Sequence, residues 1–225
     1  MYCSMANAGY DFLWIEMQHS PLTYQEVARM IWACRDAPAI PFVRVPDATA
    51  GDIQKATDIG ALGIIIPLVD TTEKIEAAVQ YAHYPPMGVR SQGNGQYRAL
   101  WGDDYRESAN ENVMIVAMIE APAGVGEVEE ISAVEGVDVV MVASTDLGSF
   151  SGLQQGNENY ESMVEEVREA TLAAGLALGG PQAWRERDGF QFFQGPTDVN
   201  LLSLGVERSL ATLGSGIAPI EGSEP

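Results

Sequence analysis

Two acidic residues, Glu120 in MIEAP and Asp146 in VASTDLGS, each follow a short apolar run. Apolar runs without polar alternation are typical of buried parallel strands, whose carboxyl ends meet at one edge of a sheet. Two carboxylates that converge at low dielectric repel each other unless a cation or a shared proton lies between them. The pair therefore predicts a site for Mg²⁺ or Mn²⁺, with other divalent cations as alternatives, because these ions prefer carboxylate and water oxygens. The competing interpretation is that one of the acids only caps the following helix.

The chain offers few residues for other kinds of catalysis. It contains two histidines and two cysteines, which excludes a three-histidine zinc site. Its only lysines, Lys55 and Lys74, fall within helix patterns, so no lysine is expected at the mouth of a site to form a Schiff base. An enolate-forming enzyme built on this chain must therefore use a metal ion as its electron sink.

Other strand ends and a glycine-rich stretch carry further candidates. Glu16 and His19 follow the run FLWI, with Gln18 between them, and Arg44 stands in FVRVP. His19 is either a proton-transfer group or an ordinary loop histidine, and Arg44 can offset the acidic field of the chain around an anionic substrate. Arg90, in YPPMGVRSQGNG, either meets a distal carboxylate of the substrate or stabilises the glycine-rich loop.

Alternating strands and helices must position these residues. Short runs rich in Val, Ile, Leu and Phe predict strands at 11–16, 41–45, 63–68, 113–119, 138–143, 176–179 and 190–194. Amphipathic stretches predict helices near 22–36, 50–59, 71–83, 123–133, 157–174 and 198–213. Residues 93–112 are too long and polar for a simple connection, which predicts a functional loop with a short helix.

The alternation predicts an α/β fold, and we favour a (β/α)₈ TIM barrel over an open sheet of seven strands. A barrel needs eight strands, one more than the sequence offers. The stretch MYCSMANAG is typical of the end of a helix that leads into the first strand seen. We therefore expect residues 1–225 to form a single barrel domain that lacks its first strand and part of its first helix.

Composition restricts the partners and the compartment. A formal net charge of −20 argues against nucleic acid or an anionic membrane surface as a partner. Cys3 and Cys34 do not make a disulfide framework, and we expect both to be small buried hydrophobes in a reducing compartment. No apolar run is long enough to span a bilayer and the N-terminus does not look like a signal peptide. The expected location is the cytoplasm.

Several segments together resemble the HpcH/HpaI aldolase family of metal-dependent 2-oxoacid aldolases, to which macrophomate synthase is related. They run in order from about residue 8 to residue 202, and they are AGYDFLWIEMQHSP, FVRVP, GALGIIIPLVDTTEKIEAAVQYAHYPPMGVRS, MIEAPAGV, VEGVDVVMVASTDLGS and GFQFFQGPTDVNLL. The third segment is long and specific. The resemblance implies a TIM barrel, a homo-oligomer (a hexamer or trimer of dimers), and reversible cleavage of a 4-hydroxy-2-oxo acid to pyruvate and an aldehyde through a metal-stabilised enolate.

The resemblance also implies roles for single residues. Glu120 and Asp146 match the metal ligands. His19, paired with Glu16, matches the residue that activates a proton-transferring water, and Arg44 matches the arginine beside the enolate and carbonyl oxygens.

Further positions are expected to line the substrate. Backbone amides at Ser144, Thr145 and Asp146 match those that hold the substrate carboxylate, and Gln18, Arg90 and Met118 complete the expected substrate-binding set. The chain departs from the family where Glu16 replaces an aspartate, Gln18 a glutamate and Met118 a glutamine, and where VASTDL replaces Gly-Pro-Ala-Asp-Leu. Two alternatives share these residues. One is an oxaloacetate decarboxylase or a C–C bond former similar to macrophomate synthase, and the other is an inactive oligomer that binds a 2-oxo acid.

Overall fold

A computed structural model describes residues 1–215 of the chain. Tyr2–Gln194 forms one compact unit, and the described residues from Gly195 onward belong to another. The expectation that residues 1–225 form one aldolase domain stays a prediction. None of the helices within residues 1–215 is long and apolar enough to cross a membrane.

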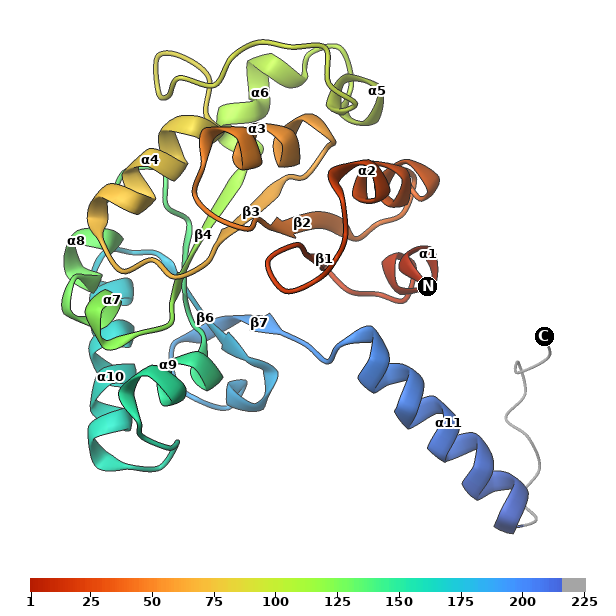
Figure 1. Cartoon of the computed structure of the whole chain (residues 1–225), viewed down its shortest axis with the longest axis vertical. Helices are drawn as coiled ribbons and strands as arrows, with labels where there is room; N and C mark the ends of the chain where they lie inside the picture. The colour runs from red at the N-terminus through yellow and green to blue at the C-terminus, as the bar shows by residue number, and fades with distance from the viewer. Residues whose placement is uncertain (216–225) are drawn as a thin grey trace. The chain divides into compact units, whose positions relative to one another are not determined.

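The first unit is built on seven parallel strands that pair in sequence order, β1 to β7. Their bounds are β1 Phe12–Glu16, β2 Ile40–Arg44, β3 Gly63–Ile66, β4 Met114–Ile119, β5 Val139–Val142, β6 Ala177–Pro181 and β7 Phe190–Gln194. An open doubly wound sheet reverses its strand order at a switch point, and this sheet has no such reversal. The sheet instead curls into an incomplete barrel with the helices on its outside (Figure 1). The prediction of a (β/α)₈-type fold that lacks its first strand is confirmed.

Helices connect the strands on the outer face, as expected for parallel pairing. In the first unit they are α1 Tyr2–Ala6, α2 Tyr24–Ala33, α3 Ala50–Asp58, α4 Thr72–Ala82, α5 Tyr97–Trp101, α6 Tyr105–Asn112, α7 Pro122–Gly126, α8 Val128–Ser132, α9 Ser144–Ser151, α10 Glu158–Ala173 and the 3₁₀ turn η1 Gln182–Trp184. The second unit contains α11 Asp198–Ser215. The single helix predicted near 123–133 is two short ones, α7 and α8, and the short α9 was not predicted.

Two apolar layers hold the sheet. Outward side chains such as Ile64 and Ile115 pack against the helices in the larger layer. Inward side chains fill the barrel, where Phe42, Val116 and Met141 are buried. Alternate strand residues point to opposite faces, so the inward face of β1 carries Phe12, Trp14 and Glu16 in that order.

Aromatic rings close the inside of the barrel at its amino end. The ring of Phe12 on β1 stacks on that of Phe192 on β7, with 4.6 Å between centroids. These strands are the two edges of the sheet, so the contact joins them from within. Gly63 on β3 leaves the space that Phe42 occupies, because a Cβ at this position would overlap the Phe42 ring.

The two cysteines correct the expectation of small buried hydrophobes. Cys3 on α1 and Cys34 at the end of α2 form a disulfide, with 5.4 Å between their Cα atoms. Cys3 is exposed and Cys34 is only partly buried. Sequence spacing did not reveal the pairing, because it depends on α1 folding back beside α2. The expectation of a reducing compartment rested on unpaired cysteines, so the disulfide withdraws its support.

Candidate active site

The acidic pair lies at the carboxyl end of the barrel. Glu120 directly follows β4, and Asp146 lies in the first turn of α9, after the neighbouring strand β5. Glu120 is 2% exposed. Burial raises the pKa of Glu120, and the nearby Asp146 carboxylate raises it further, against the lowering effects of the Leu68 N–H and the Arg44 charge. The Asp146 carboxylate is therefore close enough to Glu120 to act on its charge.

Leu68 fixes one oxygen of Glu120. The Leu68 backbone N–H donates a hydrogen bond of 2.8 Å to Glu120 Oε1. Leu68 has φ +49°, the only positive φ of a residue other than glycine within residues 1–215. A branched side chain rarely adopts this conformation, and strain of this kind persists where the surroundings impose it. The loop after β3 is thus bent so that its amide points at the Glu120 carboxylate, a feature that the sequence does not signal.

This donor set fits a hard divalent cation. Two carboxylates, one of them almost fully buried, gain from a positive charge between them. Within residues 1–215 no group of three or more His, Cys, Asp or Glu side chains is arranged to hold a metal. Two carboxylate oxygens, one each from Glu120 and Asp146, would suit Mg²⁺ or Mn²⁺, because these ions complete their shells with waters and substrate oxygens.

Arg44 and Glu16 form an ion pair across the ends of β1 and β2. Glu16 and Arg44 are register partners, and Arg44 Nη2 lies 2.5 Å from Glu16 Oε2. Arg44 Nε donates to the same oxygen at 2.6 Å. Arg44 is 8% exposed, and its charge opposes the rise that burial causes in the pKa of Glu120. The structure therefore brings Arg44 beside the acidic pair.

The expected pairing of Glu16 with the His19 ring is wrong. Glu16 Oε1 accepts the backbone N–H groups of Gln18 at 2.7 Å and His19 at 3.0 Å. The His19 side chain is exposed, and its ring makes no hydrogen bond with residues 1–215. The extra methylene of Glu16 lets its carboxylate reach Arg44 while it also caps the turn after β1. His19 remains in the β1–α2 loop at the carboxyl end of the barrel, with its ring nitrogens available.

Other expected substrate-binding positions lie at this end as well. Met118 is 2% exposed and places its Sδ 3.8 Å from Arg44 Nη1. The Gln18 side-chain oxygen is buried and has no partner within residues 1–215. The first turn of α9 contains Ser144 and Thr145, and its N-cap, Ala143, provides no side-chain acceptor. Backbone N–H groups of an uncapped first turn can accept an anion such as a carboxylate.

Arg90 lies elsewhere, which corrects its assignment to the substrate. It is 3% exposed and forms an ion pair of 3.0 Å with Asp58. Its guanidinium also donates to the Tyr105 hydroxyl at 3.1 Å and lies 4.5 Å from the ring centroid of Tyr84. Asp58 ends α3, just before β3 begins, so this cluster is at the amino end of the barrel. Arg90 stabilises the glycine-rich loop, the other role proposed from the sequence.

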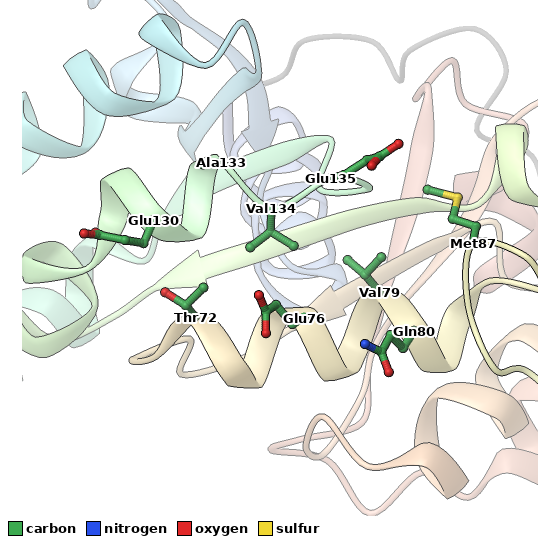
Figure 2. A pocket seen from close by; sticks show the side chains of 9 residues that line it. All are labelled: Thr72, Glu76, Val79, Gln80, Met87, Glu130, Ala133, Val134 and Glu135. Atoms are coloured by element: carbon green, nitrogen blue, oxygen red, sulfur yellow. The ribbon is translucent and has the colours of Figure 1, made fainter.

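A separate groove of about 530 Å³ runs between α4 and α8, on the outside of the barrel. Figure 2 shows its acidic and apolar lining, which includes Glu76, Glu130, Val79 and Val134. It contains none of the residues of the acidic pair or its neighbours. The groove is therefore separate from the candidate site, which lies inside the barrel mouth.

Sequence reasoning missed two residues of the site, Leu68 and Trp14. Trp14 stands two residues before Glu16 on the inward face of β1, and its Nε1 donates to Glu16 Oε2 at 3.3 Å. The alternation of β1 signals that Trp14 and Glu16 share a face. No comparable signal exists for Leu68, because its backbone conformation depends on the loop as a whole.

Comparison with known proteins gives consistent matches over most of the chain. The sequence model of the HpcH/HpaI aldolase/citrate lyase family matches residues 1–189. A hydroxypyruvate/pyruvate aldolase from Rhizorhabdus wittichii is 33% identical over 218 residues, which cover 92% of this chain and 87% of the relative.

Solved structures agree with this result. A HpcH/HpaI aldolase/citrate lyase family protein from Burkholderia cenocepacia superposes with a TM-score of 0.85 and 30% identity, covering 94% of this chain and 89% of that one. Macrophomate synthase superposes with a TM-score of 0.83 and 25% identity, covering 96% of this chain and 80% of that one. The predicted resemblance is thus confirmed at the level of sequence and fold.

Proposed function

The chain belongs to the HpcH/HpaI aldolase/citrate lyase family, and from this membership we propose that it is a class II, metal-dependent carbon–carbon lyase. Its reaction is the reversible cleavage of a 4-hydroxy-2-oxo acid into pyruvate and an aldehyde. The observation that carries the proposal is the buried Glu120 carboxylate beside Asp146, at the mouth of the barrel and within the field of Arg44. The relative named hydroxypyruvate/pyruvate aldolase supports pyruvate, or its 3-hydroxy derivative, as the 2-oxo acid that this chain binds.

We propose that Glu120 and Asp146 hold Mg²⁺ or Mn²⁺. When bound, the cation supplies Lewis-acid polarisation of the 2-oxo group and stabilises negative charge that develops on its oxygen. Leu68 holds Glu120 in place through its N–H. Arg44 presents a fixed positive charge toward the same substrate oxygens, so the charge that forms during cleavage meets a preorganised partner.

Other residues bind the substrate and move the proton. The first-turn amides of α9, at Ser144, Thr145 and Asp146, suit the substrate carboxylate because the turn is uncapped. Glu16 already accepts hydrogen bonds at both oxygens and does not serve as a base. His19 is the remaining proton carrier, because its exposed imidazole can exchange protons with water at the barrel mouth.

Decarboxylation of oxaloacetate, or C–C bond formation from the enolate that it leaves, is the second candidate. Similarity to macrophomate synthase favours it, because that fold neighbour has the same barrel over nearly the whole of this chain. Both candidates use the same acidic pair and Arg44. They differ in whether CO₂ is released and whether an aldehyde is consumed.

One assay set separates the candidates. The purified protein is stripped of metal and resupplied with Mg²⁺ or Mn²⁺, and pyruvate release is followed from 4-hydroxy-2-oxo acids and from oxaloacetate. An aldolase also consumes pyruvate and an aldehyde in the reverse direction. Metal-dependent cleavage of a 4-hydroxy-2-oxo acid supports the main proposal, whereas turnover of oxaloacetate alone supports the second. Binding of pyruvate with metal and no turnover of any substrate would identify an inactive binding protein.

We further propose that the chain forms a homo-oligomer. The second unit presents six large apolar side chains on α11 that are half exposed or more: Val199, Leu202, Leu204, Val206, Leu210 and Leu213. A helix with this many exposed apolar residues is typical of one that is covered by another surface. Sedimentation equilibrium tests the oligomer and its size. A cytoplasmic location stays a prediction, as do the absence of nucleic-acid partners and of membrane partners.

A further inference from the structure

Trp14 contacts two residues of the candidate site, Glu16 and Arg44. Its side chain is partly buried on the inward face of β1, in the same row as Glu16. The indole Nε1 donates to Glu16 Oε2 at 3.3 Å. The face of the ring meets the Arg44 guanidinium, which lies 5.3 Å from the ring centroid. One side chain thus contacts both members of the buried ion pair.

Together these contacts hold the Arg44 guanidinium from three sides. Glu16 accepts from Arg44 Nε and Nη2, the Trp14 ring faces the carbon at the centre of the guanidinium, and Met118 Sδ lies 3.8 Å from Nη1. A planar guanidinium on an aromatic face gains cation–π attraction in addition to its ion pair. A long arginine side chain without such contacts populates many rotamers. A substrate that binds it must then restrict the side chain to one rotamer, which costs conformational entropy.

Glu16 is held just as firmly as Arg44. Its two oxygens accept the backbone N–H groups of Gln18 and His19, the Arg44 guanidinium and the Trp14 indole. The acceptor side of the ion pair therefore cannot turn toward another group without breaking several hydrogen bonds. Among these donors to Glu16, Trp14 is the only uncharged side chain.

We propose that Trp14 is a positioning residue, which fixes the Arg44 guanidinium in the orientation that receives the oxygens of the 2-oxo acid. This inference rests on the proposed function, since it assigns Arg44 to the substrate. A displacement of about 1 Å in a charged group at a reacting centre costs on the order of 10²-fold in rate. Trp14 thus acts on the reaction through Arg44 rather than by touching the substrate.

Two substitutions of Trp14 distinguish a role in positioning Arg44 from a role in packing alone. Trp14→Met keeps most of the side-chain volume but has no ring face and no N–H donor, whereas Trp14→Phe restores a ring face. Trp32→Met is the matched control, because Trp32 also stacks on an arginine, Arg35, at 5.1 Å, but it lies on α2 and is 43% exposed. We expect Trp14→Met to lower kcat/KM for the 2-oxo acid substrate by about 10- to 100-fold, Trp14→Phe to recover most of this loss, and Trp32→Met to retain wild-type values.

A second measurement does not depend on turnover. Exchange of the Arg44 Nε proton with water, followed by ¹⁵N NMR, reports how firmly the guanidinium is held. The proposal predicts slow exchange in the wild-type protein and exchange at least about tenfold faster in Trp14→Met, because loss of the ring face frees the side chain. Unchanged exchange together with unchanged kcat and KM in a folded Trp14→Met protein would overturn the proposal. If the wild-type protein turns over no substrate, the proposed function fails, but the exchange measurement still decides whether Trp14 holds Arg44.

Discussion

Arg44 and Glu16 face each other as register partners at the ends of two neighbouring strands, with Arg44 Nη2 2.5 Å from Glu16 Oε2. This pairing changes what the strand-end acid does. A carboxylate that satisfies a buried arginine and two backbone amides is a structural partner, and it is not free to abstract a proton. Burial raises the pKa of Glu120, and the charge of Arg44, which Glu16 holds, opposes this rise. The charge of Arg44 therefore connects the first strand of the sheet with Glu120, which follows the fourth strand.

Replacing Glu16 with glutamine tests how much the Glu16–Arg44 ion pair contributes to the free energy of unfolding. Glu16→Gln retains the shape but leaves the Arg44 charge, which is 8% exposed, without its anion. Because the Glu16 side chain is itself 29% exposed, we expect a loss of about 1–3 kcal/mol in the free energy of unfolding, below the range for fully buried pairs. Urea unfolding measures it. Glu165→Gln, which breaks a pair with the Glu165 side chain 51% exposed, should cost less than about 1 kcal/mol, and equal losses in the two variants would contradict this account.

Leu68 offers a test of backbone strain beside the acidic pair. Leu68→Val puts a β-branched residue at φ +49°, which we expect to cost about 1–3 kcal/mol or to shift the loop. A shifted Leu68 N–H no longer holds Glu120 Oε1, so Mn²⁺ affinity should fall about 10-fold or more. Leu68→Gly is the control, because glycine adopts positive φ freely and keeps the N–H. Mn²⁺ titration followed by electron paramagnetic resonance gives the affinities, and wild-type affinity in Leu68→Val would exclude the role of this amide.

The disulfide predicts a redox-sensitive stability. Cys3 and Cys34 are separated by 31 positions, and cross-linking a loop of that length stabilises a protein by about 2–4 kcal/mol. We expect a reductant to lower the melting temperature of the wild-type protein. The double variant Cys3→Ser, Cys34→Ser should melt at the reduced temperature with or without reductant. Two free thiols in the untreated, unfolded protein would show that the disulfide does not form.

Much of the fold could be predicted from local sequence, because the central strands β2 to β5 are buried on both faces. The seven apolar runs begin and end within two residues of the observed strands. A strand covered on both faces needs a continuous apolar run, and its boundaries follow where polar residues return. The acidic pair was predictable for the same reason, since Glu120 and Asp146 follow adjacent parallel strands.

Predictions that depended on the partner of a side chain were less successful. Glu16 and His19 are close in sequence, but the strand register brings Arg44 nearer to the carboxylate. Of the two roles that the sequence leaves open for Arg90, contact with the substrate is wrong, because Asp58 and three tyrosines hold its guanidinium at the amino end of the barrel. Contacts of this kind are set by the packing of distant segments, which local patterns do not encode.

The buried carboxyl group of Asp138 should make the stability of the protein depend on pH. Burial raises the pKa of Asp138, against the lowering effects of the Ile115 N–H and the His83 charge. The folded state therefore favours the protonated acid, so the stabilisation that protonation provides is complete below the ordinary pKa of 3.8 and is lost as the pH rises through the raised pKa.

Asp138→Asn isolates this contribution, because asparagine keeps an acceptor for the Ile115 N–H and does not titrate. The free energy of unfolding of the wild-type protein, relative to that of Asp138→Asn, should decrease as the pH rises above about 4 and then level off. Urea unfolding at a series of pH values measures both proteins. A difference that is constant or that increases with pH would contradict the assignment.

The central claim is that turnover depends on a metal ion held by Glu120 and Asp146. Pyruvate release with and without metal tests this claim most directly. The wild-type protein, stripped of metal, should release no pyruvate from a 4-hydroxy-2-oxo acid and should recover activity with Mg²⁺ or Mn²⁺. Glu120→Gln removes one of the two proposed ligands while preserving the acceptor for the Leu68 N–H, and its activity should fall by about 100-fold or more. Turnover without metal, or full activity in Glu120→Gln, would contradict the account.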